Sequence, residues 1–467
     1  MTPFPALAAL LDAALANGAP RFEVANESLD AAQFAALAER VAQALRAKAL
    51  GRAEPVHVVI GNRPRDLAAF LGVWRAGGVV VPVHVATPDA VKATLQARTA
   101  ARFVVDGETL TQTAEAMPPP RPLLEDAALI VFTSGSTGEP KGVVIGHTRL
   151  AAKVEVLAQL LQLRADDTVA LPLQLTFIFG IWVSLLAAKA GARLILLPRF
   201  TLEAMQAACA NGATVAACVP TMLRAIRADE SFTAPTLRLV CTGGEPLGGA
   251  LGQALAQRFA HAALYDLYGL TETGSCDFCM GPQDQPEGFG AVGRPTPNVA
   301  YRIADDGELQ IKTPYGMLGY LDAPALTHAA FADGYFRTGD LAREREDGRV
   351  MLVGRSKEII SRGGQKIAPL EIDNLLAAHP EVAAALCAGV ADGAVGERLH
   401  AIVVRSAGAT VTETELRAWA AERIERYKLP DAIHFHDALP LGRTGKADRG
   451  AVAALVSERI ATSKPSS

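Results

Sequence analysis

The chain has 467 residues, of which 50% are hydrophobic and 20% are charged, and its formal net charge at pH 7 is -4. This composition is typical of a globular protein and excludes a disordered or fibrous chain. The length exceeds what one hydrophobic core normally supports, so two or about three domains are expected. Basic residues are scattered, without a stripe of Lys and Arg interleaved with aromatic residues, so we expect no nucleic-acid partner.

The N-terminal segment contains an apolar, helix-like stretch, but it lacks the positive charge that opens a secretory signal, and Asp12 interrupts it. We therefore expect a cytoplasmic protein. The most apolar internal segment, residues 177–198, carries glycines together with Lys189 and Arg193. This pattern predicts a buried helix followed by a strand, and no membrane span.

Six cysteines are spread through the chain. In a chain of this size, such spacing is typical of reduced thiols in a cytosolic enzyme and not of a disulfide framework. Cys276 and Cys279 form a C-x-x-C pair, but neither a second pair nor paired histidines follow. Ordinary packing near a pocket is therefore favoured over a zinc site.

The first half of the chain alternates short β-branched runs with Ala- and Leu-rich stretches. Asp30 and Gln33 have the spacing of a helix start, and apolar residues then recur at helical spacing from Phe34 onward. The alternation predicts parallel sheets covered by helices. The strands expected among the helices are residues 56–60, 128–132, 193–197, 214–219 and 237–241.

From Val299 the pattern changes. Asp305-Asp306-Gly307 and Asp347-Gly348 each lie between short alternating runs, which predicts β-hairpins. After Gly354 the chain becomes charged and then alternates helices and strands over a segment of domain size. We predict an α/β fold with a large N-terminal domain (residues 1–354), in which helices cover parallel sheets and a small antiparallel β module is added, and a small α+β C-terminal domain (residues 355–467).

A loop rich in hydroxyls and glycines follows the apolar run at 128–132. Glycines let successive backbone NH groups turn inward around an anion, hydroxyls add donors, and a lysine adds a point charge. A Walker-type loop needs Gly-Lys-Ser/Thr contiguous, whereas Lys141 is followed by Gly142, and a flexible linker lacks flanking apolar strands. We therefore predict a phosphate-binding loop. Its residues are Thr133, Ser134, Gly135, Ser136, Thr137, Gly138 and Lys141.

This loop resembles the signature phosphate loop of the adenylate-forming (AMP-binding) enzymes, which include acyl-CoA synthetases, adenylation domains of peptide synthetases and beetle luciferases. Five motifs in the family's order make the resemblance specific, and it spans nearly the whole chain. It places the chain in the acyl-CoA synthetase, or acid–thiol ligase, branch. After the loop at 134–142 the motifs are YGLTETG at 268–274, YFRTGDLA at 335–342, VGRSKEIISRGGQKIAPLEID at 353–373 and LGRTGK at 441–446.

The resemblance implies a two-step reaction. A substrate carboxylate attacks the α-phosphate of ATP to give an acyl adenylate and pyrophosphate, and the acyl group then passes to a thiol. Bringing one anion against another requires alignment and positive charge or NH donors where negative charge develops. The implied cofactors are ATP, Mg²⁺ and coenzyme A. Because no carrier domain is attached, the phosphopantetheine of a separate acyl carrier protein is an alternative acceptor.

The resemblance also implies roles for single residues. Thr271 matches the threonine that contacts the α-phosphate, and Glu272 matches the Mg²⁺ ligand, for which one carboxylate plus phosphate oxygens suffices. Tyr268 matches the aromatic residue that packs on adenine. Asp340 matches the aspartate that accepts hydrogen bonds from both ribose hydroxyls, although Thr338–Asp340 alone reads as a turn between hairpins. The remaining residues expected at the nucleotide are Gly243, Gly244, Glu245, Gly269 and Arg355.

The resemblance also gives residues of the C-terminal segment roles in one or the other of the two steps. Lys446 matches the catalytic lysine of adenylation. Lys357 matches the hinge about which a mobile C-terminal domain swings after adenylation. Gly363 and Gly364 then border the channel for the thiol, or they form only a tight turn before a helix that begins near Pro369.

The expected acyl pocket is apolar, and it lacks the aspartate that would anchor an amino acid's ammonium group. We therefore expect an aromatic or a short to medium aliphatic monocarboxylic acid. Phe177 stands where many relatives have histidine, and Glu245 resembles a variant of aryl-CoA and short-acyl-CoA ligases or is only a helix N-terminal acid. A luciferase-like oxidation and a silent nucleotide-binding module are the alternative functions. The pocket residues are Phe177, Ile178, Gly180, Val219, Gly243, Leu267 and Gly269.

Overall fold

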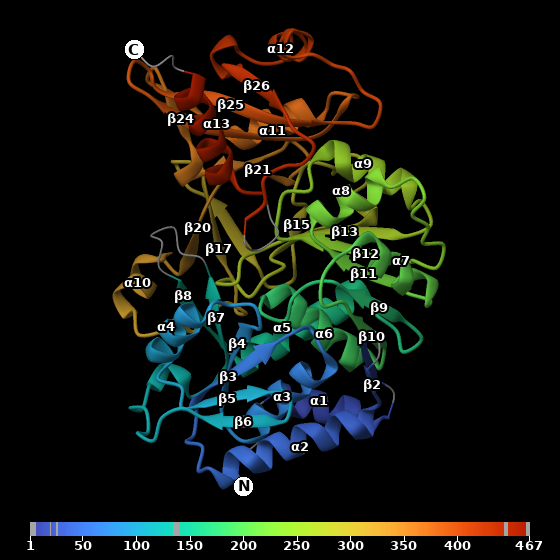
Figure 1. Cartoon of the computed structure of the whole chain (residues 1–467), viewed down its shortest axis with the longest axis vertical. Coiled ribbons are helices and arrows are strands. Elements are labelled where there is room, and N and C mark those ends of the chain that lie inside the picture. The colour runs from blue at the N-terminus through green and yellow to red at the C-terminus, as the bar shows by residue number, and fades with distance from the viewer. Residues whose placement is uncertain (1–5, 19, 25–26, 134–139, 443–446, 464–467) are drawn as a thin grey trace.

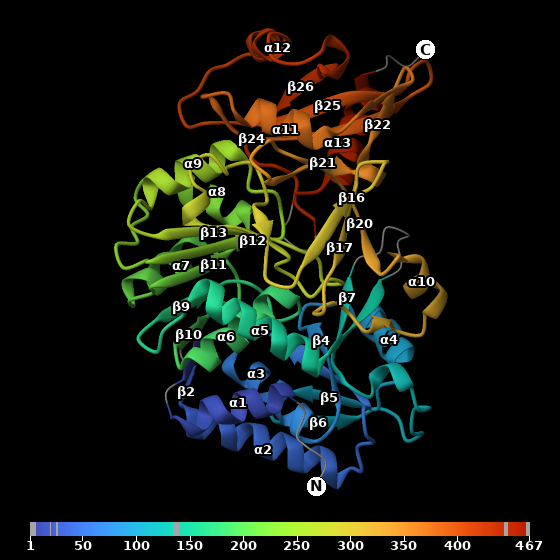
Figure 2. The ribbon, with the colours of Figure 1, turned by 180° about the vertical axis from the view of Figure 1, so that it is seen from behind.

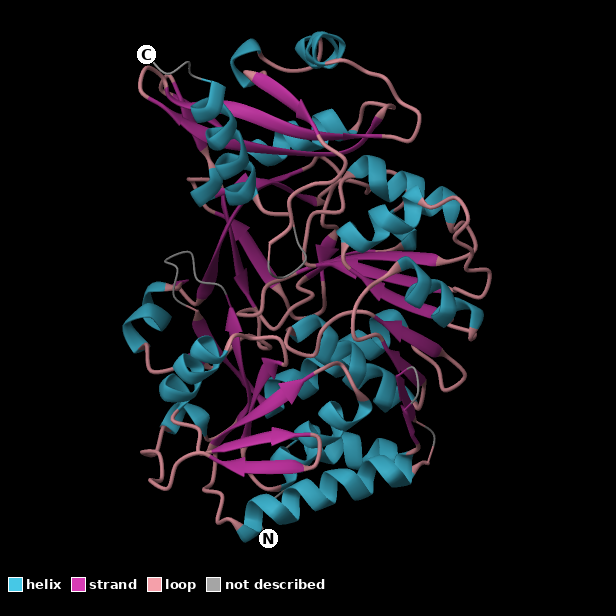
Figure 3. Ribbon diagram, viewed as in Figure 1, coloured by secondary structure: helices cyan, strands magenta, loops and turns pink. Residues whose placement is uncertain are grey.

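The computed structural model describes residues 6–18, 20–24, 27–133, 140–442 and 447–463. Two large sheets form the body of the molecule; in Figure 1 an antiparallel sheet lies above one of them and beside the other, and a separate sheet with its helices lies at the top of that view. The same order appears from behind in Figure 2, and Figure 3 separates helices from strands by colour. Among the described helices, none is long and apolar enough to cross a membrane.

The first large sheet has seven strands in the order β18-β8-β7-β4-β3-β5-β6. Its centre is parallel, but β7 pairs parallel with β4 and antiparallel with β8. The strand predicted at 128–132 is therefore present, with one parallel and one antiparallel neighbour. The strands are β3 (Pro55–Ile60), β4 (Val79–His84), β5 (Phe103–Asp106), β6 (Thr109–Gln112), β7 (Ala127–Thr133), β8 (Lys141–Gly146) and β18 (Gly319–Tyr320).

The second large sheet has nine strands in the order β15-β14-β13-β12-β11-β9-β10-β1-β2. The run from β13 to β1 is parallel, and antiparallel strands close both edges. This sheet contains the strands predicted near 193–197, 214–219 and 237–241. The strands are β1 (Arg21–Val24), β2 (Glu27–Leu29), β9 (Thr168–Leu171), β10 (Arg193–Leu196), β11 (Val215–Cys218), β12 (Leu239–Gly243), β13 (Ala263–Tyr268), β14 (Phe278–Met280) and β15 (Arg294–Pro295).

Helices cover these sheets, and one hydrophobic cluster joins side chains of α3, α5 and α6 to both sheets. The helix start at Asp30 is confirmed, because Asp30 and Gln33 form a reciprocal capping box at α2. The predicted helix and strand within 177–198 are α6 and β10. The helices are α1 (Ala6–Ala16), α2 (Ala31–Ala47), α3 (Pro64–Arg75), α4 (Asp89–Thr99), α5 (His147–Leu161), α6 (Ile178–Ala190), α7 (Leu202–Ala210), α8 (Pro220–Ala228) and α9 (Gly249–Arg258).

Both predicted hairpins are present in a five-stranded antiparallel sheet of order β16-β17-β20-β19, with β21 paired to β20. The turn reading of Thr338–Asp340 is wrong. These residues lie inside β20, because β20 is paired on both sides, with β17 and with β21. The elements are β16 (Ala300–Ile303), β17 (Glu308–Lys312), α10 (Pro324–Ala329), β19 (Phe331–Ala332), β20 (Tyr335–Glu344) and β21 (Val350–Arg355).

The C-terminal segment forms its own sheet, of order β23-β22-β25-β24 with β26 parallel to β25. Its two faces pack against α11 and α12 on one side and α13 on the other. This segment has a hydrophobic cluster of its own that begins at Ile360, and the boundary after Gly354 stays a prediction. The elements are β22 (Ile360–Arg362), β23 (Gln365–Ile367), α11 (Pro369–Ala377), β24 (Val382–Asp392), β25 (Gly396–Arg405), α12 (Glu413–Ala421), β26 (Ala432–Phe435) and α13 (Arg449–Ser463).

The predicted fold class, an α/β body with parallel sheets, an antiparallel β module and a small α+β C-terminal part, is confirmed. The six cysteines are buried and free. Short 3-10 helices complete the described chain. They are η1 (Pro122–Leu124), η2 (Pro282–Asp284), η3 (Ser356–Glu358) and η4 (Arg426–Lys428).

Candidate active site

Several predicted site residues lie where β12 and β13 end, at the carboxyl edge of the parallel part of the nine-stranded sheet. Ligands of open α/β sheets bind outside this edge. Gly243 ends β12 opposite Leu267 of β13. A Cβ on Gly243 would lie 2.3 Å from the Leu267 carbonyl oxygen, so this close approach of two strands requires glycine.

Tyr268, Asp340 and Arg355 come from three strands and meet through one carboxylate. The Tyr268 hydroxyl donates to Asp340 Oδ2 at 2.7 Å, and Arg355 Nε donates to Asp340 Oδ1 at 2.7 Å. Burial, and then the Asp340 charge, raises the pKa of Tyr268 well above its ordinary value, so its hydroxyl remains a donor. Each carboxylate oxygen keeps a second lone pair, as acceptance from a vicinal diol requires.

Glu272 lies in the loop that follows β13, and its carboxylate is held by a hydrogen bond from Tyr320, a residue that the sequence did not indicate. The Tyr320 hydroxyl donates to Glu272 Oε1 at 3.2 Å. Burial and the Glu272 charge raise the pKa of Tyr320, and Lys141 Nζ lies 5.3 Å from the centre of the Tyr320 ring. Tyr320 belongs to the two-residue strand β18, which joins β8 only through the tertiary fold.

The carboxylate of Glu272 fits the chemistry of a Mg²⁺ ligand. It is half-buried, and its partner Tyr320 also contacts Lys141, the first residue of β8, which pairs with Thr133 of β7. A hard cation takes one carboxylate and completes its shell with phosphate oxygens and water. The other predicted residues of the phosphate loop lie outside the described part of the chain; they are Ser134, Gly135, Ser136, Thr137 and Gly138.

Thr271 and Glu272 belong to a compact loop between β13 and β14. Ser275 N donates to Leu270 O at 2.8 Å, and Met317 N donates to Glu272 O at 2.8 Å. Gly269 also requires its small size, because a Cβ there would lie 2.4 Å from Cys276 N. The loop therefore holds Thr271 and Glu272 in one place relative to β13.

Asp266, inside β13, is a second residue that sequence reasoning missed. It is 7% exposed, and burial raises its pKa from 3.8 to about 7, partly opposed by a hydrogen bond from the Leu267 amide. Its register partner on β12 is Thr242, whose hydroxyl has no hydrogen-bond partner within the described residues. An acid inside an otherwise apolar run is the sequence signal that could have identified this buried carboxyl.

The residues of the predicted acyl pocket lie on or next to α6, α8, β12 and β13. Ile178, Val219 and Leu267 share one hydrophobic cluster with Trp182. The Trp182 indole NH donates to Ser275 Oγ at 3.4 Å, so helix α6 contacts the loop that carries Glu272. Gly180 of the same helix approaches the chain too closely for a side chain, since a Cβ would lie 2.5 Å from Gln174 O, and Phe177 precedes the helix and is 38% exposed.

Glu245 does not act as a helix N-terminal acid. Its Oε2 accepts from the Thr221 hydroxyl at 2.8 Å and lies 3.7 Å from Arg224 Nη1, both on α8. The other oxygen, Oε1, is buried without a partner among the described residues. Gly244, before it, has a φ of 83°. Glu245 therefore forms a polar cluster with Thr221 and Arg224 of α8.

The residues implied in alternation lie in the C-terminal segment. Gly363 and Gly364 have φ values of 54° and 82° and form the two-residue turn of the β22–β23 hairpin, so the tight-turn reading describes their backbone. Lys357 is exposed in η3, directly after β21. Lys446 lies outside the described residues.

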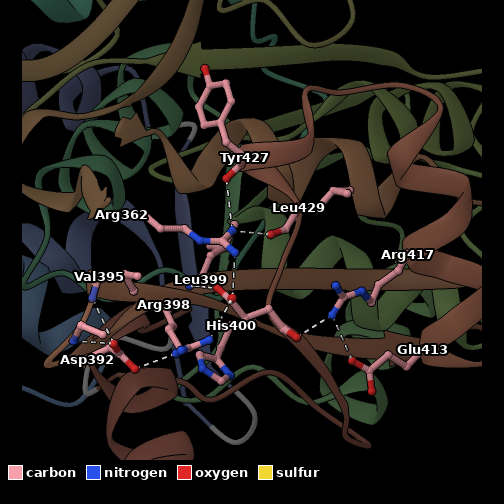
Figure 4. A network of polar contacts seen from close by, with 12 residues as sticks. Arg362, Asp392, Val395, Arg398, Leu399, His400, Glu413, Arg417, Tyr427 and Leu429 are labelled. Carbon is pink, nitrogen blue, oxygen red and sulfur yellow. Dashed lines mark hydrogen bonds and ion pairs between the residues drawn. The ribbon is translucent and has the colours of Figure 1, made fainter. Parts of the chain in front are cut away.

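The hairpin that carries Gly363 and Gly364 is anchored by Arg362. Figure 4 shows the Arg362 guanidinium directed at the chain around 427–431, where it donates to the Leu429 carbonyl oxygen at 2.9 Å. It also donates to Asp431 Oδ1 at 2.8 Å. The Gly363 amide in turn donates to Val395 O at 2.7 Å.

The chain belongs to the AMP-binding enzyme family. The family described as "AMP-binding enzyme" matches residues 12–118 and 93–321, and the "AMP-binding enzyme C-terminal domain" matches residues 371–446. The sulfoacetate–CoA ligase of Cupriavidus necator is 33% identical over 399 residues, covering 83% of this chain and 76% of that protein. The indoleacetate–CoA ligase of Aromatoleum aromaticum is 29% identical over 496 residues, covering 96% and 97%.

Solved structures agree over nearly the full length. ATP-bound MatB from Rhodopseudomonas palustris has a TM-score of 0.84 at 26% identity and covers 98% of this chain and 100% of that one. The anthranilate CoA ligase AuaEII with anthranoyl-AMP has a TM-score of 0.87 at 20% identity, covering 97% and 98%, which shows the shared fold. The predicted family and its acid–thiol ligase branch are confirmed, and the predicted cofactors ATP, Mg²⁺ and coenzyme A are those of this branch.

Proposed function

We propose that this AMP-forming acid–thiol ligase activates an apolar carboxylic acid, aromatic or short to medium aliphatic, and transfers the acyl group to coenzyme A. Transfer to a free-standing acyl carrier protein is the alternative. The observation that carries the proposal is the hydrogen bond between Tyr268, at the end of β13, and Asp340 of β20. Glu272 lies in the loop that follows β13, and Trp182 contacts the same loop.

Different residues bind different parts of the nucleotide. Asp340, already held by Tyr268 and Arg355, keeps acceptor capacity for the ribose hydroxyls. The Tyr268 ring and the segment of Gly243 and Gly244 flank the adenine position. Thr271 contacts the α-phosphate, and Glu272, oriented by a neighbouring hydroxyl, holds Mg²⁺, which neutralises phosphate charge when it is bound.

The acid enters from the side of Val219 and Trp182, with its carboxylate directed at the α-phosphate. Attack forms a bond from a carboxylate oxygen to phosphorus and releases pyrophosphate. Lys446 supplies a cation where the carboxylate and α-phosphate oxygens gather, and removing such a preorganised group commonly costs about 2.7 to 4 kcal/mol. The thiolate of coenzyme A then attacks the acyl carbonyl carbon, and AMP leaves.

The two steps use different faces of the C-terminal domain. We infer that rotation about Lys357 replaces the Lys446 loop by the Gly363–Gly364 turn, which an approaching thiol can pass because a Cβ at either glycine would meet no atom within 4 Å. The chain has a TM-score of 0.84 with ATP-bound MatB and 0.77 with apo MatB. This difference supports an arrangement of the nucleotide-bound kind.

The choice of acid rests on the pocket of this chain. Relatives are named for acids as different as sulfoacetate, malonate and indoleacetate, so their names do not select one. Val219, Leu267 and Trp182 are buried apolar side chains of one hydrophobic cluster, and Phe179 stacks on Trp182 with ring centres 5.0 Å apart. Such a cluster favours an apolar acid over a small, doubly charged one.

The test is acid-dependent exchange of pyrophosphate into ATP over a panel of carboxylic acids, followed by mass analysis with coenzyme A or a carrier protein. We expect exchange with aromatic or aliphatic monocarboxylic acids, and acyl-CoA as the product. Exchange only with dicarboxylic or sulfonated acids would contradict the proposed substrate class. Light or oxygen uptake would favour the luciferase-like alternative, and nucleotide binding without exchange would favour the silent module.

Lys446→Ala separates the two steps. The variant should lose pyrophosphate exchange and still form acyl-CoA from a supplied acyl adenylate, because its cation serves only the first step. An exposed lysine of the same domain, Lys366→Ala, is the matched control and should retain exchange. Normal exchange by Lys446→Ala would show that the assignment of this lysine is wrong.

A further inference from the structure

The loop that carries Thr271 and Glu272 ends in three consecutive residues with left-handed backbone. Gly274, Ser275 and Cys276 have φ values of 84°, 68° and 52°. Side chains other than glycine rarely adopt this conformation, and it persists only where surrounding contacts enforce it. Some feature of the fold must therefore hold Ser275 and Cys276 in place.

A fully buried cation holds this turn. Lys153 of α5 is 0% exposed, and its Nζ donates to the Cys276 carbonyl oxygen at 2.7 Å and to Thr296 Oγ1 at 3.4 Å. The same ammonium lies 4.9 Å from the centre of the Tyr315 ring. Its polar and cation–π contacts thus converge on the turn and on the segment packed behind it.

Among the described residues no carboxylate oxygen lies within 4.0 Å of Lys153 Nζ, although its charge acts on the more distant Asp277 carboxylate of the same cluster. Burying an ammonium group without a paired anion is costly, so a lysine here is a poor choice for packing alone. A methionine would fill the same space without that cost. The charge and its donor hydrogens are therefore the properties that distinguish Lys153 from an ordinary core residue.

The same face of α5 also holds the segment opposite the turn. Arg149, one helical turn before Lys153, donates from Nη1 to the Gly316 carbonyl oxygen at 2.9 Å and to the Met317 carbonyl oxygen at 2.5 Å. The Met317 amide donates to the Glu272 carbonyl oxygen. Arg149 and Lys153 of α5 therefore hold the two segments on either side of Glu272, residues 316–317 and the turn at 274–276.

Asp277 gives Lys153 an electrostatic role in the same cluster. The Asp277 carboxylate is buried and bonded to the Thr273 hydroxyl, and its other oxygen has no partner among the described residues. Burial raises the pKa of this carboxyl, and the Lys153 charge acts in the opposite direction. Lys153 thus favours the ionised carboxylate that accepts from Thr273, inside the same loop.

We propose that Lys153 is a positioning residue: it fixes the left-handed turn at 274–276 and, through it, the placement of Thr271 and Glu272 for ATP and Mg²⁺. The inference rests on the proposed function of those two residues. Lys153 itself touches neither nucleotide nor acid. Its effect passes through the Cys276 carbonyl oxygen and the Asp277 carboxylate.

The test compares Lys153→Met with Lys189→Met. Lys189 lies on the adjacent helix α6, where it pairs with Glu155 at 2.7 Å near the surface, so it controls for loss of a lysine. Two readouts are measured on the full chain: amide hydrogen exchange of residues 268–280, and the Mg²⁺ and ATP dependence of pyrophosphate exchange. Thermal unfolding reports on the overall fold.

We expect Lys153→Met to exchange its 270–277 amides at least about tenfold faster, with α6 unchanged, since the turn is then held by fewer contacts. The Mg²⁺ concentration for half-maximal activity should rise at least about tenfold, the range found when partners that orient a metal ligand are removed. Lys189→Met should change neither. Wild-type protection of the loop and wild-type Mg²⁺ dependence in Lys153→Met would overturn the proposal.

Two further variants test the same proposal if Lys153→Met gives an intermediate result or does not fold. Lys153→Gln retains a donor but no charge, and should fall between wild type and Lys153→Met. If Lys153→Met does not fold, the double variant with Asp277→Asn, which removes both buried charges, is measured with the same expected and contradicting outcomes. Because hydrogen exchange needs no substrate, absence of activity in the wild type would refute the proposed function while the exchange data still decide the role of Lys153.

Discussion

Asp266→Asn should make the protein more stable at neutral and basic pH. In the folded state, burial raises the pKa of the Asp266 carboxyl from 3.8 to about 7. The folded protein therefore binds one proton more than the unfolded chain between these pH values. Stability falls as the pH rises through this window, because the carboxyl ionises in the unfolded chain while burial keeps it protonated in the folded protein.

The expected magnitude follows from the two pKa values. The interval from 3.8 to about 7, at about 1.4 kcal/mol per pH unit, corresponds to about 4 kcal/mol. Asparagine has the same shape, can still accept from the Leu267 amide, and does not ionise. The free energy of unfolding of the variant minus that of the wild type should therefore increase by about 4 kcal/mol between pH 4 and pH 8.

Urea unfolding at pH 4, 5, 6, 7 and 8 measures this difference, with Asp305→Asn as a control at an exposed carboxyl of the β16–β17 hairpin. The control difference should stay constant over the series. A difference in unfolding free energy that is flat to within about 1 kcal/mol from pH 4 to pH 8 would refute the reasoning.

Three further variants test the site. Glu272→Gln should raise the Mg²⁺ concentration for half-maximal exchange on the order of 100-fold, measured by metal titration, and an unchanged titration would exclude it as a ligand. Asp340→Asn should raise the KM for ATP by about tenfold or more, since hydrogen bonds to a charged acceptor are worth about 1.5–3 kcal/mol, and steady-state kinetics with varied ATP decide this. Gly243→Ala should lower the free energy of unfolding by about 1–3 kcal/mol in urea, because its Cβ would meet the Leu267 carbonyl; wild-type stability would contradict that.

The sequence predicted correctly those features of the fold that depend on a few adjacent residues. The capping pair at Asp30 and Gln33, and the hairpin turns at 305–307 and 347–348, each rest on a few adjacent residues, and all are present. For the strand at residues 127–133, the sequence predicted the parallel neighbour but not the antiparallel one. An apolar run does not specify the direction of its neighbours, and β7 has one of each direction.

The residues proposed to bind the nucleotide could be identified from the sequence because they lie in contiguous motifs. Tyr268 and Asp340 fall in separate motifs 72 residues apart, and the structure joins them by a hydrogen bond. Turn chemistry misassigned Thr338–Asp340, because Gly-Asp also occurs in a strand that is paired on both sides.

Tyr320 and Lys153 could not be found from the sequence, since a lone tyrosine or a helical lysine carries no local signal. Tyr320 reaches Glu272 from 48 residues away, and Lys153 reaches Cys276 from 123 residues away. Asp266 was different, because an acid inside an apolar strand is a visible exception. The sequence motifs thus predict which residues bind the ligand, whereas the polar residues that contact those motifs from distant segments become visible only in the structure.

The central claim is that the substrate carboxylate itself attacks the α-phosphate of ATP. The most direct test uses an acid labelled with ¹⁸O in its carboxylate, incubated with ATP, Mg²⁺ and coenzyme A, followed by mass analysis of the nucleotide. We predict AMP that carries one ¹⁸O atom, together with unlabelled pyrophosphate and an acyl-CoA. Formation of ADP with labelled phosphate, or of AMP without ¹⁸O, would contradict the claim.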